Sequence, residues 1–462
     1  MTKIAIRNGR IVTSSQLYSA DLLIVDEKIS VIGELPDVAV DRTIDAGGCF
    51  VMPGGVDPHT HMDTPTMGTV TSDDFETGTV AAAVGGTTTI IDFPIQGKGD
   101  DPRTSFETWQ AKAEGKAAVD WAFHEIITEV TGDTLPALHE LVKEGVTSFK
   151  LFTAYPGSWM LDDGAIFQVL RSSSENGSFV MLHCENGLAI DVLVKEALRR
   201  GEIAPIYHAR TRPSTAEGEA TGRMIALAEM AQVPIYIVHL SAAEALRQVE
   251  EARDRNVRVF AETCPHYLVL SEEKLAEPDF EGAKYVCSPP LRSTEHTAAL
   301  WRGLANGSLQ VVSTDHAAFC FKGQKEMGRN DFSKIPNGIP GVEWRIALLH
   351  HYGVGGGHIT LNQFVDYVST APAKLFGLYP RKGEIAPGSD ADIVVFDPHV
   401  EKTLSVKDQY TNSDYNPYEG KRIVGWPKTV LLRGEVIAEN GRFVGRSGQG
   451  QFQRSSPSTA LG

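Results

Sequence analysis

The stretch that decides the fold is VMPGGVDPHTH, residues 51–61. Its apolar start is typical of a buried strand, and the strand ends in two histidines, His59 and His61. Residues two apart in an extended chain point the same way, so both imidazoles can reach one cation. An HxH pair alone occurs often by chance. The pattern becomes informative only if other strands bring metal-binding side chains to the same place.

Further strand-like runs follow at intervals long enough for a helix. With the first, the expected strands number eight and cover residues 50–56, 87–93, 120–127, 146–152, 178–183, 234–239, 257–262 and 309–314. Helical patterns lie in the gaps, as in 191–200 and 241–255, where Ser241 is the expected N-cap. Eight strand-then-helix units are what a closed parallel (β/α)8 barrel requires.

The two chain ends show a different pattern, with short β-branched runs separated by turn signals. Residues 3–33 contain Asn8-Gly9 and residues 428–445 contain Asn440-Gly441, and each dipeptide favours a two-residue hairpin. We therefore expect antiparallel β-structure at both ends, combined in one small domain. The polar tail 446–462 is expected to be either disordered or an arm onto a neighbouring subunit.

Composition narrows the functional classes. The 462 residues suffice for two to four domains or one large barrel with an accessory unit, and 42% hydrophobic with 22% charged residues indicates a globular protein. A net charge of −16 disfavours nucleic acid and anionic membranes as partners, because phosphate binding needs clustered Lys and Arg. We find no signal peptide or membrane-spanning run, and five cysteines without a CxxC pair, so we expect a cytoplasmic protein without disulfides.

Catalytic groups of a (β/α)8 barrel lie at the C-terminal ends of its strands, and four other expected strands carry titratable residues there. These residues are Lys150, His183, His239 and Asp315. Singly, a strand lysine usually extends its amine to solvent, and an aspartate before a helix usually caps it. Together with His59 and His61, however, they predict a centre for two divalent cations, zinc or substituting manganese or cobalt. An ammonium would repel cations, so Lys150 fits only as a carbamate that bridges both metals.

Motifs along almost the whole chain resemble the dihydropyrimidinase and D-hydantoinase branch of the amidohydrolase superfamily. They are GGVDPHTHMDTP, SFKLFTAY, MLHCENG, IVHLSAAEAL, ETCPHYL, EGAKYVCSPPLR, STDH, GRNDFSKIPNG and KGEIAPGSDADIVVFDP. The resemblance implies a (β/α)8 barrel beside a β-sandwich made from both chain ends. The implied boundaries are 1–52 and 378–445 for the sandwich, 53–377 for the barrel and 446–462 for the tail.

The resemblance also implies the ligands and the reaction. One zinc ion would be held by His59, His61, Lys150 and Asp315, and the other by carboxylated Lys150 (N6-carboxylysine), His183 and His239. A metal-bridging hydroxide would attack a ring amide, with Asp315 passing the proton to the leaving nitrogen and Tyr155 donating to the developing oxyanion. The main chains of Ser288 and Asn337 would hold the ring's amide edge.

The expected activity is the opening of dihydropyrimidine rings (5,6-dihydrouracil or dihydrothymine, as in pyrimidine degradation) or 5-substituted hydantoin rings to N-carbamoyl amino acids. Alternatives within the enzyme class are allantoinase and dihydroorotase. A non-catalytic scaffold, such as the collapsin response mediator proteins, is the alternative outside it. The family usually forms tetramers, so we expect a homo-oligomer, a tetramer or a dimer.

The remaining residues near the motifs have ordinary explanations. His208, His266 and His316 are expected to be structural, and Cys184 and Cys287 to be buried small side chains. The acidic pairs Asp73-Asp74 and Asp162-Asp163 are expected to begin helices.

Overall fold

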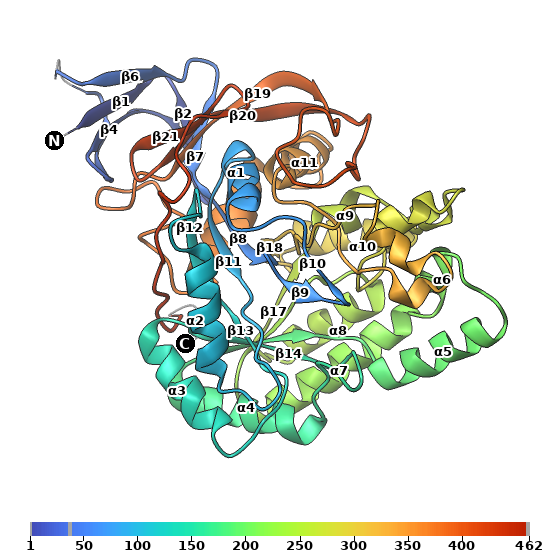
Figure 1. The fold of residues 1–462 in the computed structure, drawn as a ribbon. Coiled ribbons are helices and arrows are strands. Elements are labelled where there is room, and N and C mark those ends of the chain that lie inside the picture. The colour runs from blue at the N-terminus through green and yellow to red at the C-terminus, as the bar shows by residue number, and fades with distance from the viewer. Residues whose placement is uncertain (1, 36–38, 459–462) are drawn as a thin grey trace.

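A computed structural model describes residues 2–35 and 39–458. Its centre is a ring of parallel strands (Figure 1). In the order of their pairing they are β8 (Gly55–Thr60), β11 (Thr87–Asp92), β12 (Asp120–Phe123) continued by β13 (Glu125–Ile126), β14 (Ser148–Phe152), β15 (Phe179–His183), β16 (Ile235–Ile237), β17 (Val259–Thr263) and β18 (Val311–Val312). Because β12 and β13 are halves of one strand interrupted at His124, the ring has eight strands, as predicted.

The ring closes between β18 and β8. Thr60, the last residue of β8, and His316, four residues beyond β18, form an isolated parallel bridge. Deeper in the barrel, the buried guanidinium of Arg345 donates to the carbonyls of Val56 in β8 and Val312 in β18, at 3.1 and 3.0 Å. The fold is therefore a (β/α)8 barrel, in which all strands end at one mouth.

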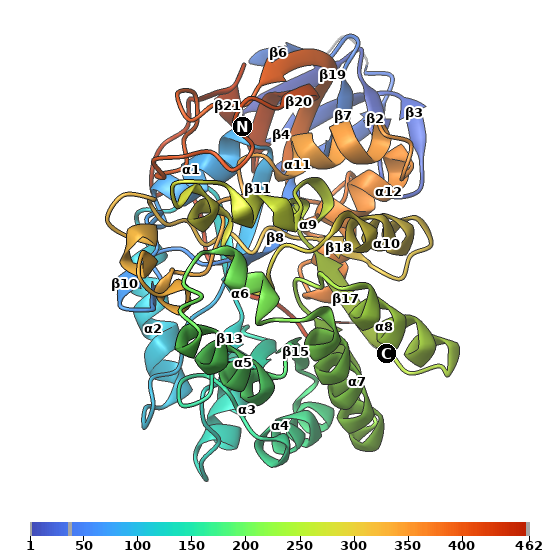
Figure 2. The same ribbon diagram turned by 90° about the vertical axis from the view of Figure 1, so that its right-hand side faces the viewer.

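Helices surround the barrel (Figures 1 and 2). They are α1 (Thr77–Val84), α2 (Pro102–Ala113), α3 (Thr134–Glu144), α4 (Asp163–Asn176), α5 (Gly187–Arg199), α6 (Ile206–Arg210), α7 (Ser214–Ala231), α8 (Ala243–Asp254), α9 (Pro265–Val269), α10 (Thr294–Ala305), α11 (Arg345–Leu348), α12 (Leu361–Val365) and α13 (Ala371–Leu375). Short 3-10 or π segments are η1 (Glu272–Ala276), η2 (Glu281–Tyr285), η3 (Lys325–Gly328), η4 (Phe332–Lys334), η5 (Leu349–Val354) and η6 (Asp366–Thr370). The helices expected within 191–200 and 241–255 are α5 and α8.

Helix starts were predicted only in part. Asp162 caps α4 by accepting from the amide of Ala165, as expected. Ser241 is not the N-cap of α8: Ala242 holds that position, and the Ser241 hydroxyl donates to the buried carboxylate of Glu217 at 2.6 Å. A buried carboxylate needs hydrogen-bond donors, and here it takes the hydroxyl that would otherwise cap the helix.

Both chain ends contribute to a pair of β-sheets beside the barrel (Figure 1). One sheet has the order β5 (Lys28–Gly33), β4 (Asp21–Val25), β1 (Lys3–Arg7), β6 (Arg42–Asp45). The other has the order β22 (Arg442–Phe443), β21 (Glu435–Glu439), β20 (Arg422–Leu432), β19 (Ile393–Thr403), β7 (Phe50–Pro53), β2 (Arg10–Val12), β3 (Leu17–Ser19). The two ends meet where β7 pairs with β19, and aliphatic side chains from both sheets form one core, among them Ile6, Ile24 and Val395.

Only one of the two expected hairpin turns is a hairpin. Asn440-Gly441 joins the paired strands β21 and β22. Asn8-Gly9 instead links β1 to β2, which belong to different sheets. The reason is close packing between layers: a Cβ on Gly9 would lie 2.5 Å from the side chain of Val51, so glycine lets the chain cross from one sheet to the other.

The expectation for the C-terminal tail was wrong over its described residues, 446–458. The amide of Trp121 donates to the Gln451 carbonyl and the amide of Gln453 donates to the Trp121 carbonyl, so the tail runs beside β12 of its own barrel. Phe452 packs its ring against Phe106 and Phe123. Main-chain pairing and this aromatic contact fix a segment whose composition is otherwise polar. Residues 459–462 lie outside the described residues.

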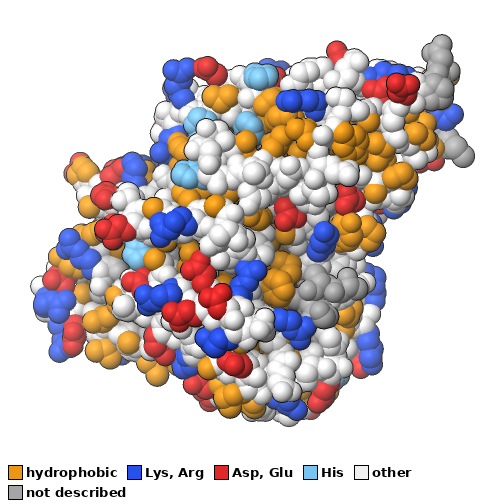
Figure 3. Space-filling view, turned by 180° about the vertical axis from the view of Figure 1, so that it is seen from behind, with side chains coloured by type: hydrophobic (Ala, Val, Ile, Leu, Met, Phe, Trp, Pro, Cys, Tyr) orange, Lys and Arg blue, Asp and Glu red, His pale blue; other side chains and the backbone are white. Residues whose placement is uncertain are grey.

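The helices and the charge distribution on one face bear on contacts with membranes and nucleic acids. Among the described residues, none of the helices combines the length and apolarity that a membrane crossing requires. On the face seen from behind, Lys and Arg side chains are interspersed with Asp and Glu (Figure 3). That face therefore lacks the continuous basic surface that phosphate binding uses.

Candidate active site

Three of the six expected metal ligands form one cluster at the barrel mouth. The Nε2 atoms of His59, at the end of β8, and of His61, just after it, each lie 3.2 Å from Oδ1 of Asp315, which follows β18. The donor atoms of the three residues all lie within 4.8 Å of one another, close enough to share one ion. Lys150 of β14 places its Nζ 3.3 Å from His59 Nε2. Four side chains thus meet at the barrel mouth, two from within strands and two from residues that follow strands.

The other two histidines form a second cluster beside the first. His183 ends β15 and His239 follows β16, and His183 Nδ1 lies 3.0 Å from His239 Nε2. The ring centroids of His59 and His239 are 5.3 Å apart, so the clusters adjoin. Both rings are buried, and Nδ1 of His239 has no hydrogen-bond partner among the described residues. Buried imidazole nitrogens that face one another without a protein acceptor fit a bound cation.

Carboxylates behind the imidazoles orient them, and the sequence prediction missed these residues. Glu262 of β17 contacts Nδ1 of His59, and it also accepts from the Tyr236 hydroxyl at 2.9 Å and the His239 amide at 3.1 Å. Glu185 contacts Nε2 of His183 at 2.9 Å. Each contact occupies one ring nitrogen and leaves the other facing the site. Both acids lie within quoted motifs, ETCPHYL and MLHCENG, which is the one signal that could have identified them.

Burial sets the protonation of the centre. Lys150 is 1% exposed, and burial lowers the pKa of its amine to about 8. Burial, and then the neighbouring Lys150, hold the pKa of His59 well below its ordinary value. Burial also raises the pKa of Glu262 to about 7. Burial also holds the pKa of His239 well below its ordinary value. The rings of His59 and His239 are therefore neutral near neutral pH, the form in which imidazole binds a metal, and part of Lys150 is the free amine.

A cavity of about 500 Å3 opens above these groups. Tyr155, Ser288 and Asn337 line it together with Lys150 and Asp315. The side-chain amide of Asn337 donates to the Ser288 hydroxyl at 3.1 Å. Burial together with Glu185 raises the pKa of Tyr155, so its hydroxyl stays protonated and can donate. Further lining comes from Met67, within residues 63–68, and from Trp159, within residues 156–163.

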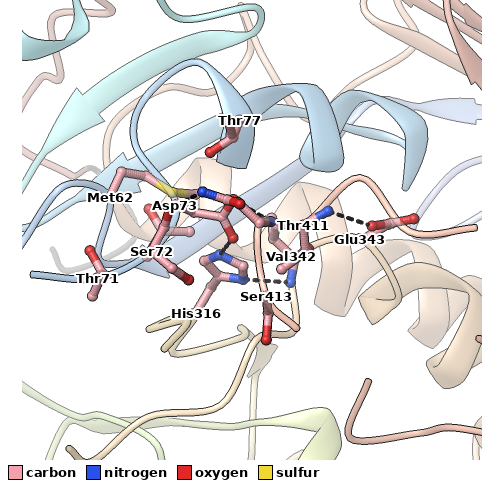
Figure 4. A network of polar contacts seen from close by, with 12 residues as sticks. Met62, Thr71, Ser72, Asp73, Thr77, His316, Val342, Glu343, Thr411 and Ser413 are labelled. Atoms are coloured by element: carbon pink, nitrogen blue, oxygen red, sulfur yellow. Dashed lines mark hydrogen bonds and ion pairs between the residues drawn. The ribbon is translucent and has the colours of Figure 1, made fainter. Parts of the chain in front are cut away.

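His316 anchors the loop that carries His61. Its carbonyl accepts from the His61 amide at 2.8 Å, and its Nδ1 accepts from the amides of Gly341 and Val342. Its Nε2 lies 3.0 Å from a carboxylate oxygen of Asp73 (Figure 4). Asp73 was expected to begin a helix, and this was wrong: it is buried, while Asp74 accepts from the first amides of the α1 region.

The other residues given ordinary explanations are also buried within the framework. His208 Nε2 contacts the Cys287 carbonyl at 2.8 Å, and the His266 ring packs edge-on against Tyr267. Cys184 and Cys287 are 2% and 1% exposed, as expected of small core side chains.

Comparisons with known proteins agree with this geometry. The model of the amidohydrolase family matches residues 50–437. The chain is 53% identical to a D-hydantoinase of Geobacillus stearothermophilus, over 100% of this chain and 98% of the relative. It superposes on a dihydropyrimidinase from Brevibacillus agri with a TM-score of 0.98 at 50% identity, covering 99% and 100% of the two chains. An L-hydantoinase from Arthrobacter aurescens, 31% identical, gives a TM-score of 0.89 over 98% and 99%.

The chain therefore belongs to the amidohydrolase family, the superfamily that the motifs indicated. It is an enzyme, and its reaction is the hydrolysis of a cyclic amide.

Replacement of Glu262 with Gln should weaken divalent-metal binding by about 10–100-fold, because the neutral amide no longer fixes the His59 ring as a charged acceptor. Chelator competition measures this affinity. Glu251→Gln, at an exposed carboxyl of α8, is the matched control and should bind metal as the wild type does. Equal metal affinity in the two variants would contradict an orienting role for Glu262.

Proposed function

We propose that the enzyme opens dihydropyrimidine or 5-substituted hydantoin rings to N-carbamoyl amino acids with two divalent metal ions, zinc in the native state and manganese or cobalt as substitutes. The observation that carries this proposal is the convergence of four imidazoles, one amine and one carboxylate beneath a cavity of about 500 Å3. His59, His61 and Asp315 would hold one ion, and His183 and His239 the other. The names of the relatives, D-hydantoinase and dihydropyrimidinase, support the choice of rings.

Lys150 would serve both ions as a carbamate. The amine is buried between the two clusters, and no ion pair joins it to a carboxylate among the described residues. A pKa of about 8 leaves enough neutral amine to attack carbon dioxide, forming an N–C bond and releasing one proton. The product would carry a negative charge and two oxygens, and so could serve as a ligand of both cations. Metal binding would in turn stabilise the carbamate against loss of carbon dioxide.

Residues of the protein would carry out the other steps of the reaction. Bound divalent ions lower the pKa of water from 15.7 to about 7, which supplies a nucleophile at neutral pH. The Asp315 carboxylate would accept the proton released during attack and deliver it to the leaving ring nitrogen. The Tyr155 hydroxyl would donate to the oxygen of the attacked carbonyl as its charge develops. The main chains of Ser288 and Asn337 would hold the amide edge of the ring.

We further propose that the enzyme works in the cytoplasm as a homo-oligomer, a tetramer or a dimer. Two large apolar side chains on α5 support the assembly: Leu188 and Val192 are 62% and 54% exposed, one helical turn apart. Exposed apolar side chains grouped on one face are a feature of subunit interfaces.

Replacement of Lys150 with Ala should abolish activity and most metal binding, because it removes the ligand common to both ions. Elemental analysis and turnover of a hydantoin test this. Small carboxylic acids such as formate or acetate should restore both in part by filling the space of the carbamate. Lys143→Ala, at an exposed lysine of α3, is the control and should behave as the wild type. Full metal content in Lys150→Ala would refute the bridging role.

Replacement of Tyr155 with Phe should lower kcat by about two to three orders of magnitude, because the oxyanion loses one donor while the ring remains in place. Steady-state kinetics with metal content measured in parallel test this, and the metal content should not change. Tyr379→Phe, at a partly exposed tyrosine outside the cavity lining, is the control. An unchanged kcat would remove the Tyr155 hydroxyl from the reaction.

A further inference from the structure

Two segments of the cavity wall carry the proposed ring-binding main chains, residues 286–289 around Ser288 and residues 336–338 around Asn337. In both, the carbonyls of neighbouring residues are occupied by hydrogen bonds from within the protein. The Cys287 carbonyl accepts from His208 Nε2 at 2.8 Å, and the Pro289 carbonyl accepts from the Tyr267 hydroxyl at 2.7 Å. The carbonyls of Ser288 and Asn337 accept no hydrogen bond from the described residues and remain available to a ligand.

One buried lysine joins the two segments from behind. Lys325, in η3, is 0% exposed and does not line the cavity. Its Nζ donates to three carbonyls, those of Val286 at 2.8 Å, Pro336 at 2.6 Å and Gly338 at 2.8 Å. Burial lowers the pKa of this amine to about 7, and the three protons of its ammonium form have one carbonyl acceptor each. Two of the acceptors flank Asn337, and the third lies two residues before Ser288.

The segments also contact each other directly through two hydrogen bonds. The side-chain amide of Asn337 donates to the Ser288 hydroxyl at 3.1 Å. The Gly338 amide donates to the Val286 carbonyl at 3.0 Å. Gly338 has φ of 155°, and a Cβ there would lie 2.4 Å from the Ala317 carbonyl oxygen, so the turn is closely packed on its other side. Without the lysine, the Pro336 and Gly338 carbonyls would be left without their buried donor, which costs free energy unless the segment moves to find another.

Lys325 also acts on the Asn337 amide through the peptide group that precedes it. The Pro336 carbonyl and the Asn337 N–H belong to one peptide unit, so a cation bound to that oxygen strengthens that N–H as a donor. The main-chain N–H of Asn337 at present donates to the thioether sulfur of Met67 at 3.3 Å, and thioether sulfur is a weak acceptor. A ring carbonyl would be a much better one.

From this geometry we infer that Lys325 is a positioning residue for substrate: it fixes the spacing of the Ser288 and Asn337 segments and directs their free peptide groups at the ring. The inference rests on the proposed function, because it takes these segments to hold the amide edge. Lys325 has no hydrogen bond or ion pair with the six proposed metal ligands. Its removal should therefore weaken ring binding and leave the metal centre intact.

The test compares Lys325→Met, which keeps the length of the side chain and removes all three donors, with Lys322→Met, an exposed lysine three residues earlier. Lys325→Met should raise KM for a 5-substituted hydantoin by about tenfold to a hundredfold, with kcat within about threefold of the wild type. The loss of contacts that hold the ring's amide edge equally well in the ground state and the transition state changes KM alone. Metal content should be that of the wild type. Lys325→Gln, which keeps up to two donors, should show a smaller rise in KM.

Three results would overturn the inference. One is a wild-type KM in Lys325→Met with a lower thermal midpoint, as expected of a merely structural lysine. Another is a loss of kcat and metal with KM unchanged, which would place the effect at the metal centre. The third applies if Lys325→Met does not fold: a wild-type KM in Lys325→Gln would then contradict positioning, whereas a raised KM would support it. Failure of the proposed function is distinguishable, because the wild type would then not turn over the ring at all.

Discussion

The structure depends on an amine whose burial disfavours its charged form more than the nearby carboxylates of Asp315 and Glu262 favour it. Lys150 is 1% exposed, Nε2 of His59 lies 3.3 Å from its Nζ, and the ring centroids of Phe93 and Phe152 lie 4.9 and 5.0 Å from it. Burying an unpaired ammonium is costly, so the amine loses its proton readily. The free amine, beside the neutral rings of His59 and His239, offers lone pairs that a divalent cation and carbon dioxide can use. The barrel brings this about because all its strands end at one mouth.

The six proposed metal ligands are surrounded by a second layer of buried polar groups, and this layer extends into the rest of the chain. Glu262 supports both clusters, since it contacts the His59 ring and the His239 amide. Asp73 contacts His316 with one carboxylate oxygen and accepts the amide of Asn412 with the other. Asn412 lies between β19 and β20, in the C-terminal part of the chain. Two contacts thus hold the loop after β8. One comes from the barrel, through His316, and the other from the segment between β19 and β20, through Asn412.

Much of this was predictable from the sequence, because strand periodicity and strand-end residues are local signals. Eight apolar runs predicted the strands of the barrel, and the residues at their ends predicted the side chains that gather around His59 and His239. What the sequence did not predict depends on tertiary partners. Asn8-Gly9 has hairpin composition, yet the strands it joins pair elsewhere. The tail is polar, yet it is fixed by main-chain bonds to Trp121. Glu262 and Lys325 act on groups far along the chain, so no spacing in the sequence indicated their partners.

The most direct measurement is a carbon-13 NMR spectrum of metal-loaded enzyme equilibrated with 13C-labelled bicarbonate. The account predicts one labelled carbamate per chain, absent when Lys150 is replaced, in a protein that holds two divalent ions. An active, metal-loaded enzyme in which Lys150 carries no label would contradict it, because the amine would then have no means of joining the two clusters.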